Sequence, residues 1–123
     1  MKKIVLKCLQ LQAQMRILHW QTTSFAEHNA FGTFYTAADV IIDRLVEAIS
    51  GKYERFLLGN LESVVVSDYG MLKTHMFIVD MDTFFKVEIY NCGVDKENDD
   101  EIVNIIQELR GELDKLKYLL SLK

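Results

Sequence analysis

The stretch that decides the fold is FGTFYTAADVIIDRLVEAI, residues 31–49. Its apolar side chains return every three or four residues, which is the spacing of one face of an α-helix. The spacing continues on both sides, and we predict one long helix from about residue 27 to residue 58, ended by Gly59-Asn60. The apolar positions of this face are Phe31, Phe34, Ala38, Ile41, Ile42, Leu45, Ile49 and Phe56.

Segments at both ends of the chain have the same period. We predict a first helix over residues 2–22 and a last helix over about residues 98–122, each with one apolar face. Thr22-Thr23-Ser24 form a polar break whose hydroxyls can cap the helix that follows. Gly111 interrupts the last helix and indicates a close contact with another helix. The apolar faces are Ile4, Cys8, Leu11, Met15 and Leu18, and Ile102, Ile105, Ile106, Leu109, Leu113, Leu116 and Leu120.

The middle of the chain is less regular. Residues 61–70 hold a β-branched run between turn-forming residues, and we predict a connecting loop. Residues 71–91 have apolar side chains at helical spacing, but Phe85, Val87 and Ile89 also alternate as they would in a strand. The length of this segment and its helical neighbours favour a helix. A hairpin here would instead make the chain an α+β adaptor.

Four helices with short links predict an all-α fold, an antiparallel four-helix bundle. The chain has 123 residues, 50% of them hydrophobic, which is enough for a single domain over residues 1–123. Proline, which kinks or ends a helix, is absent, so long helices can form without this interruption. Cys8 and Cys92 have neither the spacing of a disulfide framework nor that of a metal knuckle, and we expect both thiols to be reduced.

Charge and hydropathy exclude two classes of partner. The chain has 14 basic and 18 acidic side chains, a formal net charge of −4, and no lysine cluster. Binding to DNA through its phosphates is therefore not supported. No run of apolar residues is long enough to span a membrane, and we expect a cytoplasmic protein.

Two imidazoles and two carboxylates are the candidate functional residues. His19 and His28 lie around the break between the first two helices, whereas Asp43 and Glu47 lie far along the second. This donor set suits a non-haem iron site, but on one helix Asp43 is roughly 22 Å from His28. If the four residues share a metal, two copies of the chain must pair antiparallel, so that the histidines of one copy meet the carboxylates of the other.

The order of these residues resembles that of the Dps family, the small ferritin-like proteins of starved bacteria. The family shares a histidine–tryptophan pair near the end of its first helix, a histidine that opens the second, and an Asp-x-x-x-Glu pair fifteen residues after that histidine. This chain has His19-Trp20, Ser24-Phe25-Ala26-Glu27-His28-Asn29-Ala30-Phe31 and Asp43-Arg44-Leu45-Val46-Glu47 in the same order. Its last helix, from Asp100 to Leu120, is also similar to the closing helix of the family.

The resemblance implies a ferritin-like bundle that assembles, through two-fold dimers, into a hollow dodecamer. It implies a ferroxidase centre between subunits, with His19 and His28 from one subunit, Asp43 and Glu47 from its neighbour, and Glu47 as a bridge between metals. Iron(II) would be oxidised there by peroxide or oxygen, and the iron stored or detoxified. The expected metal is therefore non-haem iron, mono- or dinuclear.

Two features depart from the family's pattern. Many members have a carboxylate four residues after the second histidine, where this chain has Gly32, so the second metal position is weak, filled through water or absent. The two histidines are also closer together than is usual in the family. The alternative function is a helical assembly protein that keeps a ferritin-like scaffold and has lost the ferroxidase activity.

Overall fold

The computed structural model describes residues 1–122 and contains, in that range, four α-helices and one short 3₁₀ helix. These elements are α1 (Lys2–Gln21), α2 (Phe25–Lys52), α3 (Thr74–Lys86), η1 (Glu88–Asn91) and α4 (Asp100–Ser121). No strand occurs among the described residues, so the all-α prediction is confirmed there. Helix α3 favours the helical interpretation of residues 71–91, and the hairpin interpretation is wrong.

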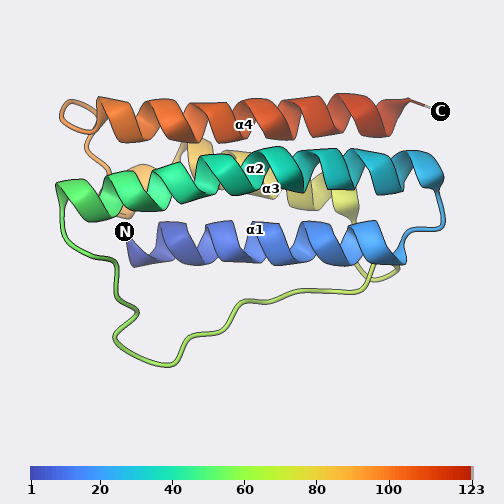
Figure 1. Cartoon of the computed structure of the whole chain (residues 1–123), viewed down its shortest axis with the longest axis horizontal. Coiled ribbons are helices and arrows are strands. Elements are labelled where there is room, and N and C mark those ends of the chain that lie inside the picture. The colour runs from blue at the N-terminus through green and yellow to red at the C-terminus, as the bar shows by residue number, and fades with distance from the viewer. Residues whose placement is uncertain (123) are drawn as a thin grey trace.

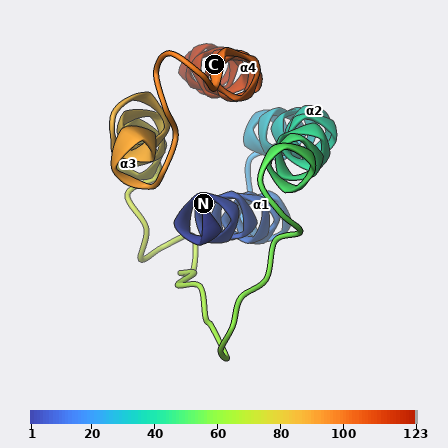
Figure 2. The ribbon, with the colours of Figure 1, turned by 90° about the vertical axis from the view of Figure 1, so that its left-hand side faces the viewer.

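The four helices lie at the corners of a square when they are seen along the bundle axis (Figure 2). Neighbouring helices run in opposite directions: α1 and α2 form a hairpin, α4 packs on α2, and α3 packs on α4 (Figure 1). α2 and α3 run in the same direction and lie at opposite corners. The prediction of an antiparallel bundle is therefore confirmed. The prediction of short links is wrong for residues 53–73, which cross the length of the bundle.

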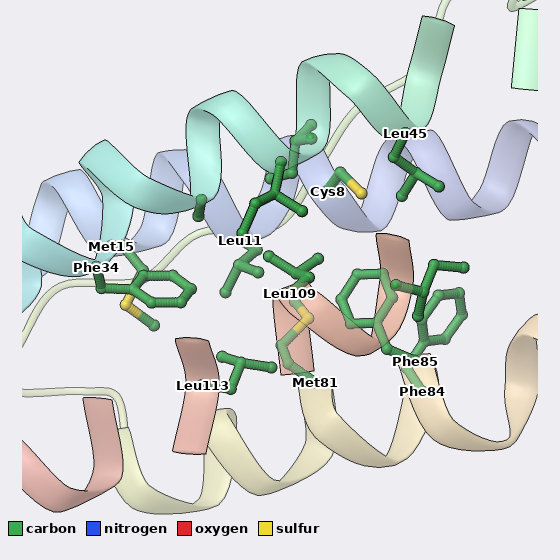
Figure 3. Close-up of a cluster of buried hydrophobic side chains, with 14 of the residues drawn as sticks. Cys8, Leu11, Met15, Phe34, Leu45, Met81, Phe84, Phe85, Leu109 and Leu113 are labelled. Carbon is green, nitrogen blue, oxygen red and sulfur yellow. The ribbon is translucent and has the colours of Figure 1, made fainter. Parts of the chain in front are cut away.

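One hydrophobic core joins all four helices. Its centre is formed by side chains such as Leu11 of α1, Leu45 of α2, Met81 of α3 and Leu109 of α4 (Figure 3). Burial of Cys8 in this core raises the pKa of its thiol to about 12, because a thiolate would lose its hydration there. Both cysteines are free thiols. Within the described part of the chain, no helix has both the length and the apolar character needed to cross a bilayer.

The turn between α1 and α2 is short and capped. Ser24 is the N-cap of α2, and its Oγ accepts a hydrogen bond from the backbone N–H of Glu27 at 3.2 Å. The Glu27 carboxylate accepts hydrogen bonds from the hydroxyls of Thr22 at 2.6 Å and Tyr69 at 2.7 Å. The predicted cap is thus present, and it holds the end of α1 beside the start of α2.

Helix α2 ends at Lys52, before the predicted end at residue 58. Asp99, fully buried just before α4, accepts a hydrogen bond from the Tyr53 hydroxyl at 2.6 Å and pairs with Lys52 at 2.7 Å. Burial acts to raise the pKa of Asp99, but the hydrogen bonds from Lys52 and Tyr53 outweigh it and lower the pKa to about 2. These bonds tie the last turn of α2 to the start of α4, and the chain leaves the helix at Tyr53.

The crossover, residues 53–73, is held against α1 by glutamine side chains. Gln14 is 1% exposed and its amide makes two hydrogen bonds to Ser67. Nε2 donates to the backbone carbonyl at 2.9 Å, and Oε1 accepts from the backbone N–H at 2.8 Å. The pairing satisfies a buried amide and fixes an extended stretch of chain. The other glutamines that bind the crossover are Gln10 and Gln21.

Candidate metal site

His19 and His28 meet where α1 ends and α2 begins. His19 lies in the last turn of α1 and His28 in the first turn of α2. Because the turn between them is short, the two rings stack, with centroids 3.7 Å apart and planes 18° apart. The Phe25 ring stacks with His28 at the longer distance of 6.4 Å. The two predicted nitrogen ligands are therefore neighbours within one chain.

Each histidine is fixed through its Nδ1 atom. Nδ1 of His19 lies 2.7 Å from the backbone carbonyl oxygen of His28, and Nδ1 of His28 lies 2.9 Å from that of His19. A carbonyl oxygen only accepts hydrogen bonds, so both Nδ1 atoms carry a proton. In a neutral ring Nε2 then has a free lone pair, which is the form in which histidine binds a metal. Among residues 1–122 neither Nε2 atom has a hydrogen-bond partner, so both are left for another ligand.

Gly32 makes room for the His19 ring. A Cβ atom at position 32 would lie 3.0 Å from Cε1 and 3.2 Å from Nδ1 of His19, closer than optimal carbon contacts, at about 3.5 Å or more. A side chain at this position would push the ring away from its bond to His28. From the sequence, Gly32 was interpreted as the place of a missing carboxylate. That interpretation is incomplete, because the absence of a side chain is also what lets His19 pack here.

A polar network continues from the histidines along the contact between α1 and α2. The Tyr35 ring meets His19 edge-on at 5.3 Å, and the Arg16 guanidinium lies 4.5 Å from the centre of the Tyr35 ring. Arg16 forms an ion pair with Asp39, which also accepts a hydrogen bond from Gln12 Nε2 at 3.0 Å. The carboxylate of Asp39 is thus already paired with side chains of the same chain. We did not predict this network, although Gln12 and Arg16, and Tyr35 and Asp39, have the one-turn spacing that indicates a shared face.

Asp43 and Glu47 lie one turn apart on the exposed side of α2. They take part in none of the ion pairs among the described residues. Along the helix, Asp43 is roughly 22 Å from His28, so one chain does not bring the four predicted ligands together. Within residues 1–122, no three His, Cys, Asp or Glu side chains form a group that could hold a metal ion. The four-residue site between two copies stays a prediction.

Comparisons with known proteins correct one expectation. The model of DUF5856, described as a family of unknown function, matches residues 19–120. No curated protein and no solved structure matches the chain. The resemblance to the Dps family is therefore wrong: it rested on a few spaced residues, and such short patterns recur by chance on unrelated helices. Since the match covers most of the 123 residues, the chain belongs to the DUF5856 family, a family of unknown function.

Proposed function

We propose that this protein binds iron(II) between two copies of the chain and oxidises it with hydrogen peroxide or oxygen. His19 and His28 of one copy supply the nitrogen ligands, and Asp43 and Glu47 of the other supply the oxygen ligands. The proposal depends on these donor residues and not on a family resemblance. The observation that carries it is the pair of anchored imidazoles, each with Nδ1 bonded to a carbonyl and Nε2 left free.

The anchored pair fits a metal because the Nδ1 atom of each ring already donates to a backbone carbonyl. A metal-binding histidine usually donates its second ring N–H to a backbone carbonyl or a carboxylate, which fixes both the tautomer and the ring direction. His19 and His28 do this for each other, and Gly32 leaves room for the His19 ring. Imidazoles combined with carboxylates and open positions suit redox-active iron.

The spacing along α2 supports a homo-oligomer built on two-fold dimers. If two α2 helices pair antiparallel about an axis between Thr36 and Ala37, His28 of one copy lies level with the midpoint between Asp43 and Glu47 of the other. The axis repeats the contact at the opposite end, so that a dimer would hold two equal sites. Thr36, Asp43 and Glu47 are exposed in the single chain and are open to a second copy.

The topology supports the finer part of the proposal, a ferritin-like bundle. In ferritin-like folds one long crossover connects two of the four helices. Residues 53–73 cross the bundle in this way between α2 and α3. A metal site in the middle of the bundle is not favoured, because the core there is apolar. The proposed site therefore lies between chains.

Iron(II) is the substrate of the proposed reaction. Two iron(II) ions each give one electron to hydrogen peroxide, which takes up two protons and leaves as two molecules of water. The carboxylates of Asp43 and Glu47 favour the oxidised ion, because their attraction grows with the charge of the iron. The product iron(III) hydrolyses to an oxide, so the role of the protein would be iron detoxification or storage.

Oxidation kinetics test the proposal. Purified protein given iron(II) and hydrogen peroxide should develop the near-ultraviolet absorbance of iron(III) faster than a protein-free solution. His28→Ala and Asp43→Ala should each lower the initial rate by about tenfold or more. His75→Ala is the matched control, because His75 is an exposed histidine of α3 outside the site. Equal rates in the wild type and both site variants would defeat the proposal.

A second candidate function is an assembly protein without iron chemistry. Gly32 favours it, because the His19 ring occupies the space in which a carboxylate from the same chain would reach the site. Metal stoichiometry separates the two functions. Fewer than one iron per two chains, with no peroxide-dependent oxidation, would support the assembly protein.

A further inference from the structure

The exposed face of α2 is mostly polar. Its two large apolar side chains are Phe25, 78% exposed, and Val40, 63% exposed. A stable dimer buries about 800 Å² on each copy, usually around an apolar centre. Phe25 and Val40 alone give this face a small apolar centre. The polar residues that line the face are Asn29, Thr33, Thr36, Asp43 and Glu47.

The two ends of this face have complementary chemistry. Asp43 and Glu47 form an acidic end that takes part in none of the ion pairs of residues 1–122. At the other end, His28 of α2 and His19 of the adjoining α1 form an imidazole end; both are half-buried and their Nδ1 atoms are already bonded. In an antiparallel pair each acidic end meets an imidazole end. A divalent cation between the two ends would give the carboxylates a charged partner that offsets the water they lose.

We infer that a divalent metal ion switches the chain from a monomer to a two-fold dimer. The occupant of the α2 face is a second copy, and the ions at its two ends supply the free energy of association. This inference depends on the shared site of the proposed function and adds how that site controls assembly. Each carboxylate pair then gains a doubly charged partner.

Linkage gives the size of the effect. A ligand that binds the dimer and not the monomer raises the association constant of the dimer. The factor grows with the ratio of the free ligand concentration to the Kd of the ligand. At a metal concentration of about 100 times Kd, one site contributes a factor of about 100, and two equal sites contribute about 10⁴. Such a change takes a protein from almost entirely monomeric to almost entirely dimeric.

Molar mass in solution tests the switch directly. Size-exclusion chromatography with light scattering would be run on chelator-treated protein, on protein with anaerobic iron(II), and on protein with cobalt(II). We expect the single-chain mass of 14.3 kDa without metal and twice that mass with either ion, reversed by adding chelator. A dimer in chelator-treated protein would overturn the switch.

Two variants locate the interface without disturbing the fold. Glu47→Gln keeps the shape of an exposed side chain and should abolish metal-dependent dimerisation, whereas Glu54→Gln, also exposed, should not. Thr36→Arg retains all four ligands but places two like charges near the two-fold axis. It should lower the association constant of the dimer by about tenfold or more. Dimerisation of Thr36→Arg at the wild-type metal concentration would show that α2 does not form this contact.

The outcomes separate the switch from the proposed function. A dimer that forms without metal, and loses iron oxidation in the Glu47→Gln variant, overturns the switch and leaves the shared site standing. A monomer that oxidises iron overturns both. A protein that binds neither iron(II) nor cobalt(II) overturns the proposed function, and the switch falls with it.

Discussion

Replacing Gly32 with alanine tests the packing of the candidate site most sharply. The added Cβ would lie 3.0 Å from Cε1 of His19, so the ring must move or the helices must separate. The His19 ring is held by its Nδ1 bond to His28 and by stacking at 3.7 Å, and moving it sacrifices both contacts. Gly111→Ala is the matched control, because no atom of the described part of the chain lies within 4 Å of a Cβ at that helical position.

The two substitutions should change the free energy of unfolding in opposite directions. Alanine is about 1 kcal/mol better than glycine inside a helix, so Gly111→Ala should stabilise the protein by about that amount. At Gly32 the same gain is opposed by overpacking of about 1–3 kcal/mol, which gives a net loss of about 1 kcal/mol. The difference between the two variants is about 2 kcal/mol, or roughly 8 °C in Tm for a chain of this length.

Urea titrations of the wild type and both variants measure this difference. The affinity for cobalt(II), measured in parallel, should fall in Gly32→Ala and stay unchanged in Gly111→Ala. NMR signals of the His19 ring should shift in Gly32→Ala alone. If Gly32→Ala stabilises the protein as much as Gly111→Ala and leaves the His19 signals in place, the ring does not occupy the space beside Gly32.

Three further predictions concern the scaffold. Asp99→Asn should destabilise the protein by about 2 kcal/mol at neutral pH. Against the effect of burial, hydrogen bonds from Lys52 and Tyr53 lower the pKa of Asp99 from its usual 3.8 to about 2, so the wild type should lose this advantage as the pH falls from about 4 towards 2. Acid unfolding curves of both proteins would measure the loss. Gln14→Leu should leave the Ser67 backbone without its partners, so we expect faster hydrogen exchange and proteolysis in the crossover, with helices α1 to α4 still protected. Burial and a pKa of about 12 should keep Cys8 unreactive towards a thiol reagent until the protein unfolds, whereas the partly exposed Cys92 should react in the native state, as mass spectrometry of labelled protein would detect.

Helical periodicity was enough to predict most of the fold. The first and last helices begin and end within about two residues of their predicted bounds, since each has a regular apolar face. The end of α2 was not predictable in this way. It is set by Asp99, which lies far along the chain and binds Lys52 and Tyr53. Periodicity carries no information about a partner so distant in sequence.

The candidate site was predictable in its residue types and not in its contacts. The spacing of fifteen residues from His28 to Asp43 already implies that one chain cannot join them. The exchange of Nδ1 bonds between His19 and His28 depends on the angle between α1 and α2, which no local pattern specifies. Two glycines show that a local sequence pattern does not predict which glycine lies at a close contact. Gly111 was predicted to mark a close helix contact, and this is wrong; Gly32 is the glycine against which a side chain packs.

The central claim is that imidazoles and carboxylates of different copies form one site, and mixing two variants tests it most directly. His28→Ala retains the carboxylates, and Glu47→Gln retains both imidazoles. In a mixed dimer, one site combines the intact histidines of one variant with the intact carboxylates of the other. The second site lacks both His28 and Glu47. We predict that each variant alone oxidises iron(II) slowly and that the mixture regains a substantial part of the wild-type rate. A mixture no faster than the average of the two separate variants, with both variants folded by circular dichroism, would contradict the claim.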